Sequence, residues 1–170
     1  MNNGYSDALF SLARENHNID SMFESFNNFM QLLEDEDIKE YLFSLVVTKE
    51  EKKQLIDKLK DNFITDFIYF LYVVLDREDI QNIEDIFLDF KNEYYELAKI
   101  KEVIILESSY LEKPRLNKLQ QLFDKKYPDY EIRIVEKIDK DMLKGIEVYI
   151  DNKKIGANLL SELNELKAKI

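Results

Sequence analysis

The sequence has no cysteine, and it contains only three glycines and two prolines among 170 residues. Without cysteine, disulfides, thiolate metal sites and cysteine nucleophiles are excluded. Because glycine and proline supply most tight turns, their scarcity indicates long helices joined by short connections. The glycines stand at positions 4, 145 and 156, so no phosphate-binding loop or dinucleotide-binding motif can be assembled from them.

The sequence also lacks a long hydrophobic run. Its longest apolar segment, residues 67–75, is bordered by Asp66 and Asp76, whereas a membrane span needs roughly 20 apolar residues. We therefore expect a buried helix there. The start of the chain, MNNGYSDALF, has neither the basic and apolar regions of a signal peptide nor the arginine-rich composition of a transit peptide. These features predict a bacterial cytoplasmic protein.

Charge is unevenly distributed along the chain. The formal net charge is −11, of which residues 1–100 carry −12 and residues 101–170 carry +1. A strongly acidic half repels phosphate backbones, which argues against nucleic-acid binding. The asymmetry predicts two parts that have different partners. Apolar residues make up 45% of the chain, enough for a hydrophobic core.

Apolar residues recur at helical spacing through the first hundred residues. Thr48 and Glu51 match a capping box, so one helix should begin there, and Asp79 is a plausible N-cap for the last. The pattern predicts a bundle of six helices, at about residues 5–13, 19–33, 38–45, 48–59, 64–75 and 79–97.

The fifth of these helices is apolar around almost its whole circumference, whereas a surface helix normally has one apolar stripe. One explanation is that it lies at the centre of the bundle. The other is that one of its faces forms part of a groove for a partner's amphipathic helix. Physical reasoning from the residues gives these two explanations similar weight.

After Lys101 the period changes from helical to alternating. A β-branched run at residues 103–106 predicts a buried strand, and a helix should follow from near Lys113, with Pro114 in its first turn. Strands are expected at residues 132–138 and 146–150.

Two features are expected near the end of the chain. Asp151-Asn152 suits a hairpin turn, and Asn158 can cap a final helix. The predicted fold is mainly α: a six-helix bundle over residues 1–101, then a small α+β domain over residues 102–170.

Little in the sequence indicates catalysis. The single histidine, His17, lies in a polar segment between two predicted helices, where a solvated surface residue is the usual outcome. The acidic run at residues 34–37 lacks the alternating ligand spacing and central glycine of a calcium loop. No serine lies in a nucleophile-elbow motif. We predict no catalytic, cofactor-binding or metal site.

Three segments resemble, in order, the δ subunit of bacterial F-type ATP synthases, a family related to the mitochondrial oligomycin-sensitivity-conferring protein. They are YSDALFSLAREN at residues 5–16, FLYVVLDREDIQNIEDIFLDFKNEYYE at residues 70–96, which includes Arg77, and DKDMLKGIEVYIDNKKIGANLLSELNELKAKI at residues 139–170. The resemblance departs from the family pattern at two places. Lys144-Gly145 replaces the usual Gly-Gly, and Gly156-Ala157-Asn158 replaces the usual Asp-Gly-Ser, where asparagine can still serve as a cap.

The resemblance implies a non-catalytic stator subunit, without a cofactor, in an enzyme that couples proton or sodium flow to ATP synthesis. The helical domain would bind the amino-terminal helix of an α subunit in a groove between its first and fifth helices. The carboxyl-terminal domain would contact the carboxyl-terminal region of the b subunit, so that the head resists the rotor's torque. Membrane association would be indirect, at the cytoplasmic face of the cell membrane. On this sequence the groove residues would be Tyr5, Leu9, Leu12, Phe67, Phe70, Leu71 and Val74.

Other functions remain open at this point. One is a stand-alone helical adaptor, or an RNA-binding bundle of the antitermination type, although the acidic helical half shows no basic stripe. Another is an enzyme that uses paired carboxylates, although a glycine loop and a metal motif are missing. For the stator, the acidity suggests that the α-subunit helix carries a complementary basic face.

Overall fold

A computed structural model describes residues 4–108, 111, 113–139, 147–151 and 153–155 of the chain. The chain divides into two compact units, Met1–Tyr94 and Tyr95–Ile170. The final helix predicted from Asn158, and both departures from the family pattern, lie outside the described residues.

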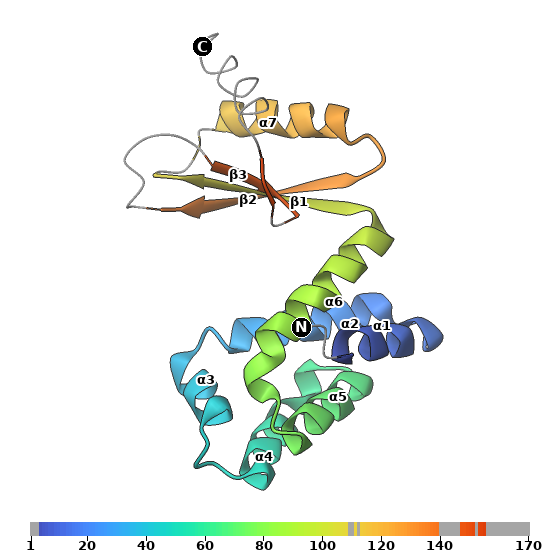
Figure 1. Cartoon of the computed structure of the whole chain (residues 1–170), viewed down its shortest axis with the longest axis vertical. Coiled ribbons are helices and arrows are strands. Elements are labelled where there is room, and N and C mark those ends of the chain that lie inside the picture. The colour runs from blue at the N-terminus through green and yellow to red at the C-terminus, as the bar shows by residue number, and fades with distance from the viewer. Residues whose placement is uncertain (1–3, 109–110, 112, 140–146, 152, 156–170) are drawn as a thin grey trace. The chain divides into compact units, whose positions relative to one another are not determined.

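The first unit is a bundle of six α-helices with short connections (Figure 1), as predicted. Two short 3-10 helices, η1 (Lys60–Asn62) and η2 (Ile80–Asn82), precede the last two of them. The final turn of the sixth helix belongs to the second unit. The six helices are α1 (Tyr5–Glu15), α2 (Ile19–Leu32), α3 (Glu36–Phe43), α4 (Lys49–Leu59), α5 (Thr65–Asp76) and α6 (Ile83–Ala98).

Phenylalanine rings form the centre of this bundle. Phe26 of α2 is completely buried, and its ring centroid lies 5.2 Å from that of Phe67 and 5.6 Å from that of Phe70, both on α5. Its ring also lies 5.8 Å from that of Phe90 on α6. Aromatic pairs at such distances add to the free energy gained from burying their large apolar area. Phe26 therefore joins α2, α5 and α6 in one core.

Two predicted helix starts had different outcomes. The capping box is present: Thr48 Oγ1 accepts a hydrogen bond from the Glu51 amide, and the Glu51 carboxylate accepts one from the Thr48 amide. The prediction that Asp79 caps the sixth helix was wrong. Its side chain caps no backbone amide, because Tyr5 donates a hydrogen bond to this carboxylate, and η2 comes before α6 begins at Ile83.

One apolar residue was also assigned to the wrong place. The third helix was predicted to run to Leu45, one of its apolar residues, but α3 ends at Phe43 and Leu45 is 91% exposed. The backbone of Ser44 leaves the helical region, with φ −59° and ψ 135°. The helix therefore stops before Leu45 can reach the buried face.

The second unit contains a four-stranded sheet in the order β2-β1-β3-β4, with α7 over one face (Figure 1). Its elements are β1 (Ile100–Glu107), α7 (Lys113–Lys126), β2 (Glu131–Ile138), β3 (Glu147–Ile150) and β4 (Lys153–Lys154). β1 pairs with β2 in parallel, so a crossover is required between them, and α7 provides it. The predicted strands, the helix from Lys113 and the α+β class are confirmed.

Alternation along β1 places Val103 and Ile105 in the core of this unit, together with Leu119 and Phe123 of α7. β3 and β4 form the expected hairpin. Asp151, which follows β3, adopts a φ of 49°, a conformation that aspartate tolerates better than most residues. Among the described residues, no helix is long and apolar enough to cross a lipid bilayer.

Candidate protein-binding surface between two helices

Helices α1 and α5 are neighbours that run in opposite directions (Figure 1). At one end, Tyr5, the first residue of α1, donates a hydrogen bond to Asp79, which follows α5, and its ring centroid lies 6.4 Å from that of Phe70, in the middle of α5. At the other end, Asn16 and Asn18, which follow α1, donate hydrogen bonds to Asp66 near the start of α5. The surface between the two helices is thus bounded by polar contacts at both ends.

The first of these ends is centred on Tyr5. Its hydroxyl donates a hydrogen bond of 2.5 Å to Asp79, and the Arg77 guanidinium carbon lies 5.8 Å from the centroid of its ring. Burial raises the pKa of Tyr5, and the hydrogen bond to the Asp79 carboxylate raises it further. The phenol therefore stays protonated around neutral pH and keeps its role as donor.

The second end is rich in hydrogen-bond acceptors. One oxygen of Asp66 accepts from the side-chain amides of Asn16 at 2.8 Å and Asn18 at 2.9 Å. The side-chain oxygen of Asn18 is buried and receives no hydrogen bond from the described part of the chain. The Asp66 carboxylate therefore places a negative charge at this end of the surface.

Three large apolar side chains of these two helices are exposed. Leu12 on α1 is 40% exposed, and on α5 Tyr69 is 61% and Val73 is 46% exposed. Leu12 lies seven residues, or two helical turns, after Tyr5 and is therefore on the same side of α1 as Tyr5. In the same way, Val73 lies seven residues after Asp66 and is on the same side of α5 as Asp66. We name Leu12, Tyr69 and Val73 the α1–α5 surface.

The seven predicted groove residues differ in how deeply the structure buries them. Leu12 is exposed and Tyr5 is half-buried. The others lie in the core of the first unit, where none is more than 9% exposed: Leu9, Phe67, Phe70, Leu71 and Val74. These five support the α1–α5 surface from beneath.

Sequence reasoning missed Tyr69 and Val73. Because α5 is apolar around its circumference, the periodicity gives no signal for which of its residues face the core. The structure shows that α5 has a buried face and an exposed one. The four-residue spacing of Tyr69 and Val73 was visible in the sequence, but it could not be distinguished from that of core residues.

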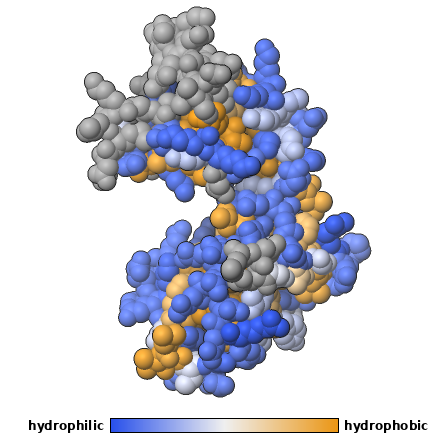
Figure 2. Space-filling view, in the orientation of Figure 1, coloured by the Kyte–Doolittle hydropathy of each residue, from blue (hydrophilic) through white to orange (hydrophobic). Residues whose placement is uncertain are grey.

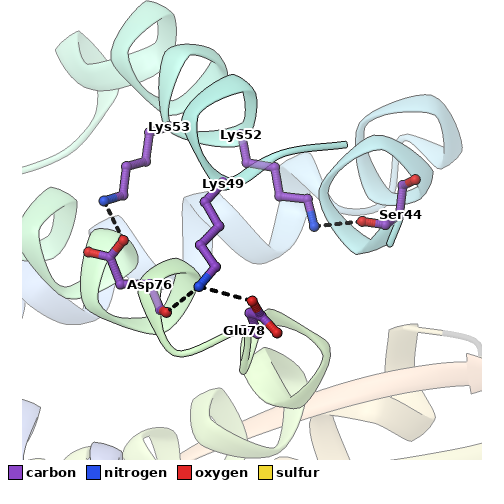
Figure 3. A network of polar contacts seen from close by, with 6 residues as sticks. All are labelled: Ser44, Lys49, Lys52, Lys53, Asp76 and Glu78. Atoms are coloured by element: carbon purple, nitrogen blue, oxygen red, sulfur yellow. Dashed lines mark hydrogen bonds and ion pairs between the residues drawn. The ribbon is translucent and has the colours of Figure 1, made fainter. Parts of the chain in front are cut away.

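Lysines of α4 hold the end of α5 (Figure 3). Lys49 Nζ donates a hydrogen bond of 2.8 Å to the carbonyl oxygen of Asp76 and forms an ion pair of 2.9 Å with Glu78. Lys53 pairs with the Asp76 carboxylate at 2.6 Å. Cations at a helix C-terminus interact favourably with its exposed carbonyls. The hydrogen bond that the Lys49 ammonium donates to the Glu78 carboxylate is the largest effect that raises the pKa of Lys49.

The turn after α5 therefore connects α4 with α1 through alternate residues. Asp76 and Glu78 meet the lysines of α4, whereas Arg77 and Asp79 meet Tyr5 of α1. Glu78 adopts a φ of 61°, which ends α5 and allows the chain to turn. This arrangement fixes the edge of α5 that carries Val73.

Another exposed apolar feature lies over the α3–α4 connection, where Figure 2 shows a hydrophobic patch. Leu45 and Val46 are each 91% exposed there. They border a hollow of about 510 Å³ whose wall includes Phe43, Lys52 and Ile80. Lys52 is buried, and its ammonium donates a hydrogen bond of 2.7 Å to the carbonyl oxygen of Ser44 (Figure 3).

The titratable residues of the described part form no cluster of three or more potential metal ligands. In the acidic run, Asp35 accepts hydrogen bonds from the amides of Asp37 and Ile38 and so caps α3. His17 is exposed in the turn after α1. Asp35 therefore acts in helix capping, and His17 faces solvent.

Comparison with known proteins gives a whole-chain match. The model of the family "ATP synthase delta (OSCP) subunit" matches residues 1–170. The chain is 23% identical over 167 residues to ATP synthase subunit delta of Lactobacillus johnsonii, covering 98% of this chain and 92% of the relative. It is 26% identical over 171 residues to the Clostridioides difficile protein of the same name, covering 99% and 94%. The Natranaerobius thermophilus protein is 29% identical over 172 residues, covering 98% and 93%.

The fold is also similar to that of a solved structure. A chain in the cryo-EM structure of the Toxoplasma gondii mitochondrial ATP synthase hexamer superposes with a TM-score of 0.76. The superposition covers 96% of this chain and 95% of that one at 13% sequence identity. At this level of identity the likeness concerns the fold alone.

Proposed function

Because the chain belongs to the ATP synthase delta (OSCP) subunit family, we propose that it is a non-catalytic stator subunit of an F-type ATP synthase. The observation that carries the proposal is the family match over residues 1–170, together with relatives named ATP synthase subunit delta that align over nearly their whole length. A stator needs stable surfaces for two partners, and this chain supplies two compact units.

In this proposal the first unit binds the amino-terminal helix of an α subunit. The support is the α1–α5 surface, where Leu12, Tyr69 and Val73 remain exposed between two polar ends. An amphipathic helix is recognised when its apolar face covers such a strip. The phenylalanine core beneath makes the surface rigid, which lowers the entropy that binding costs.

The same proposal assigns the second unit to the carboxyl-terminal region of the b subunit. Bound to both partners, the chain would connect the catalytic head to the peripheral stalk and resist the torque of the rotor during ion-coupled ATP synthesis. It would lie at the cytoplasmic face of the cell membrane and reach the membrane only through the complex.

Charge supports a basic face on the α-subunit helix. Residues 1–100 carry a formal net charge of −12, and the Asp66 carboxylate borders the α1–α5 surface. Complementary charge speeds and orients docking more than it strengthens the final complex. A synthetic α amino-terminal peptide should therefore bind more slowly as salt increases, and an association rate independent of ionic strength would contradict this part of the proposal.

Co-purification tests the stator function. The full-length chain should be retained by the α-containing catalytic head and, separately, by the cytoplasmic part of the b subunit. A chain with an intact circular dichroism spectrum that binds neither would overturn the proposal. Retention by the head that is lost in a variant of the α1–α5 surface would link the function to that surface.

A further inference from the structure

A basic pocket lies within the second unit, beside the β3–β4 turn. It is open to solvent and has a volume of about 300 Å³. Four lysines and one aspartate contribute to its lining, which gives these side chains a formal charge of +3 in a chain whose net charge is −11. The polar lining consists of Lys101, Lys126, Tyr127, Asp151, Lys153 and Lys154.

Two of these lysines have their charge compensated within the unit. Lys101 Nζ lies 2.6 Å from Asp151, 4.5 Å from the ring centroid of Tyr130 and 5.5 Å from that of Tyr127. Lys154 pairs with the carboxylate of Glu147. A carboxylate and two aromatic faces hold the Lys101 ammonium in place, so Lys101 forms a fixed part of the wall.

The other two lysines differ from these. Neither Lys126, in the last turn of α7, nor Lys153, in β4, has a carboxylate partner within the described ranges. The Lys126 ammonium lies 6.0 Å from the ring centroid of Tyr127. Ile150 and Ile155 provide an apolar wall to the same pocket. Among the described residues, two lysines without a carboxylate partner thus stand beside an aromatic ring and an aliphatic surface.

We propose that this pocket binds an acidic segment of a partner protein. Carboxylates of the segment would pair with Lys126 and Lys153, and an apolar side chain between them would pack on Ile150, Ile155 and the ring of Tyr127. A peptide matches this lining better than a nucleic acid, because Ile150 and Ile155 offer an aliphatic wall on which an apolar side chain can pack, whereas a phosphate backbone would use the lysines alone. The inference rests on the proposed function only in that the second unit binds a partner protein, and it adds the contact surface and its chemistry.

The test uses a fluorescein-labelled hexapeptide of alternating glutamate and leucine, titrated with the full-length chain and followed by fluorescence anisotropy. The variant Lys126→Gln/Lys153→Gln should weaken binding at least about fivefold, since two exposed ion pairs are lost. The matched control is Lys118→Gln/Lys137→Gln, which removes the same charge from two exposed residues of the same unit that do not line the pocket. It should change the affinity by less than about twofold.

Three results would overturn the inference. The pocket variant could bind as the parent does, both variants could lose affinity equally, or an oligonucleotide or inorganic phosphate could displace the peptide at equal charge concentration. Co-purification with the head and the b subunit distinguishes a failure of the pocket assignment from a failure of the stator proposal. If the parent chain co-purifies while the peptide result fails, the pocket assignment alone is wrong. If co-purification fails but only the pocket variant loses the peptide, the pocket assignment stands.

Discussion

The hydroxyl of Tyr5 donates a hydrogen bond to the carboxylate of Asp79, 74 residues later in the chain. The first residue of α1 is thereby attached to the turn that follows α5, and the same turn is held by Lys49 and Lys53 of α4. Asp76 and Glu78, on either side of Arg77, form the ion pairs with these lysines. The contact closes one end of the α1–α5 surface and fixes the spacing of its two helices.

Tyr5→Phe should destabilise the first unit by about 1.5 kcal/mol, because it removes a partly buried hydrogen bond to a carboxylate and leaves Asp79 without this donor. Urea unfolding followed by circular dichroism measures the loss. Tyr94→Phe is the control: Tyr94 also donates to a carboxylate, that of Asp20 at 2.8 Å, but at an exposed site. Its effect should stay within about 0.5 kcal/mol. Equal effects of the two variants would contradict the special role of Tyr5.

Val73→Asp should weaken binding of the α amino-terminal peptide at least about tenfold with folding intact, because it places a charge in the centre of the apolar strip. Leu88→Asp on α6 is the matched control, since Leu88 is 42% exposed and Val73 is 46% exposed. It should bind as the parent chain does. If both variants bind equally well, the α1–α5 surface is not the binding site.

Phe70→Asp should unfold the first unit, in contrast to Val73→Asp. Phe70 is only 9% exposed, and its ring centroid lies 5.6 Å from that of Phe26 and 5.8 Å from that of Phe67. A buried, unpaired carboxylate there costs more than about 4 kcal/mol. The helical circular dichroism signal and the thermal midpoint report the result. A folded Phe70→Asp chain that had lost only head binding would place Phe70 on the surface instead of in the core.

Stability should depend on pH through the capping box of α4. The backbone hydrogen bond from Thr48, followed by its side-chain hydrogen bond, lowers the pKa of Glu51. Because the pKa of Glu51 is lower in the folded chain, its carboxylate stabilises the fold above the pKa of the unfolded chain, about 4.3. This stabilisation is lost as the pH falls through the lower pKa of the folded chain. The stability difference between the parent and Glu51→Gln should therefore shrink below about pH 4.3, as urea unfolding at several pH values can show. Thr48→Ala should cost about 1 kcal/mol at neutral pH.

Tyr72 should titrate unusually late. The Asp57 carboxylate, which accepts its hydrogen bond, and burial raise the pKa of Tyr72 to about 12. Because the folded pKa is raised, this contribution to stability is present below about pH 10 and is lost as the pH rises toward 12. The difference in tyrosinate absorbance between the parent and Tyr72→Phe reports the ionisation of Tyr72, and it should rise near pH 12. When both chains also carry Asp57→Asn, this difference should rise at a lower pH. A difference curve centred near pH 10 in both backgrounds would refute the assignment.

Local patterns in the sequence were sufficient for most of the architecture. Helical periodicity located all six helices of the bundle, a β-branched run located β1, and alternation located β2 and β3. The capping box at Thr48 could be recognised because both of its partners lie within four residues. Asp151 at the β3–β4 turn was also predictable, because the turn's demand for positive φ is local.

One error involved a long-range contact and the other a local change in the backbone. Asp79 looked like a helix cap, but Tyr5 takes its carboxylate from 74 residues away. Leu45 followed the apolar spacing of α3, but the backbone left the helix at Ser44. Neither the contact of Tyr5 nor the end of α3 leaves a periodic signal in the sequence.

The sequence alone determined the class of fold, the absence of a nucleotide loop and the acidic character of the helical half, because composition and spacing are properties of the chain itself. Only the tertiary structure decided which side of the uniformly apolar α5 faces solvent, because burial depends on the helices that pack around it. It placed Phe67 and Phe70 in the core and left Tyr69 and Val73 exposed beside Leu12. The tertiary structure also brings lysines of α7 and β4, which are far apart in the sequence, into one pocket.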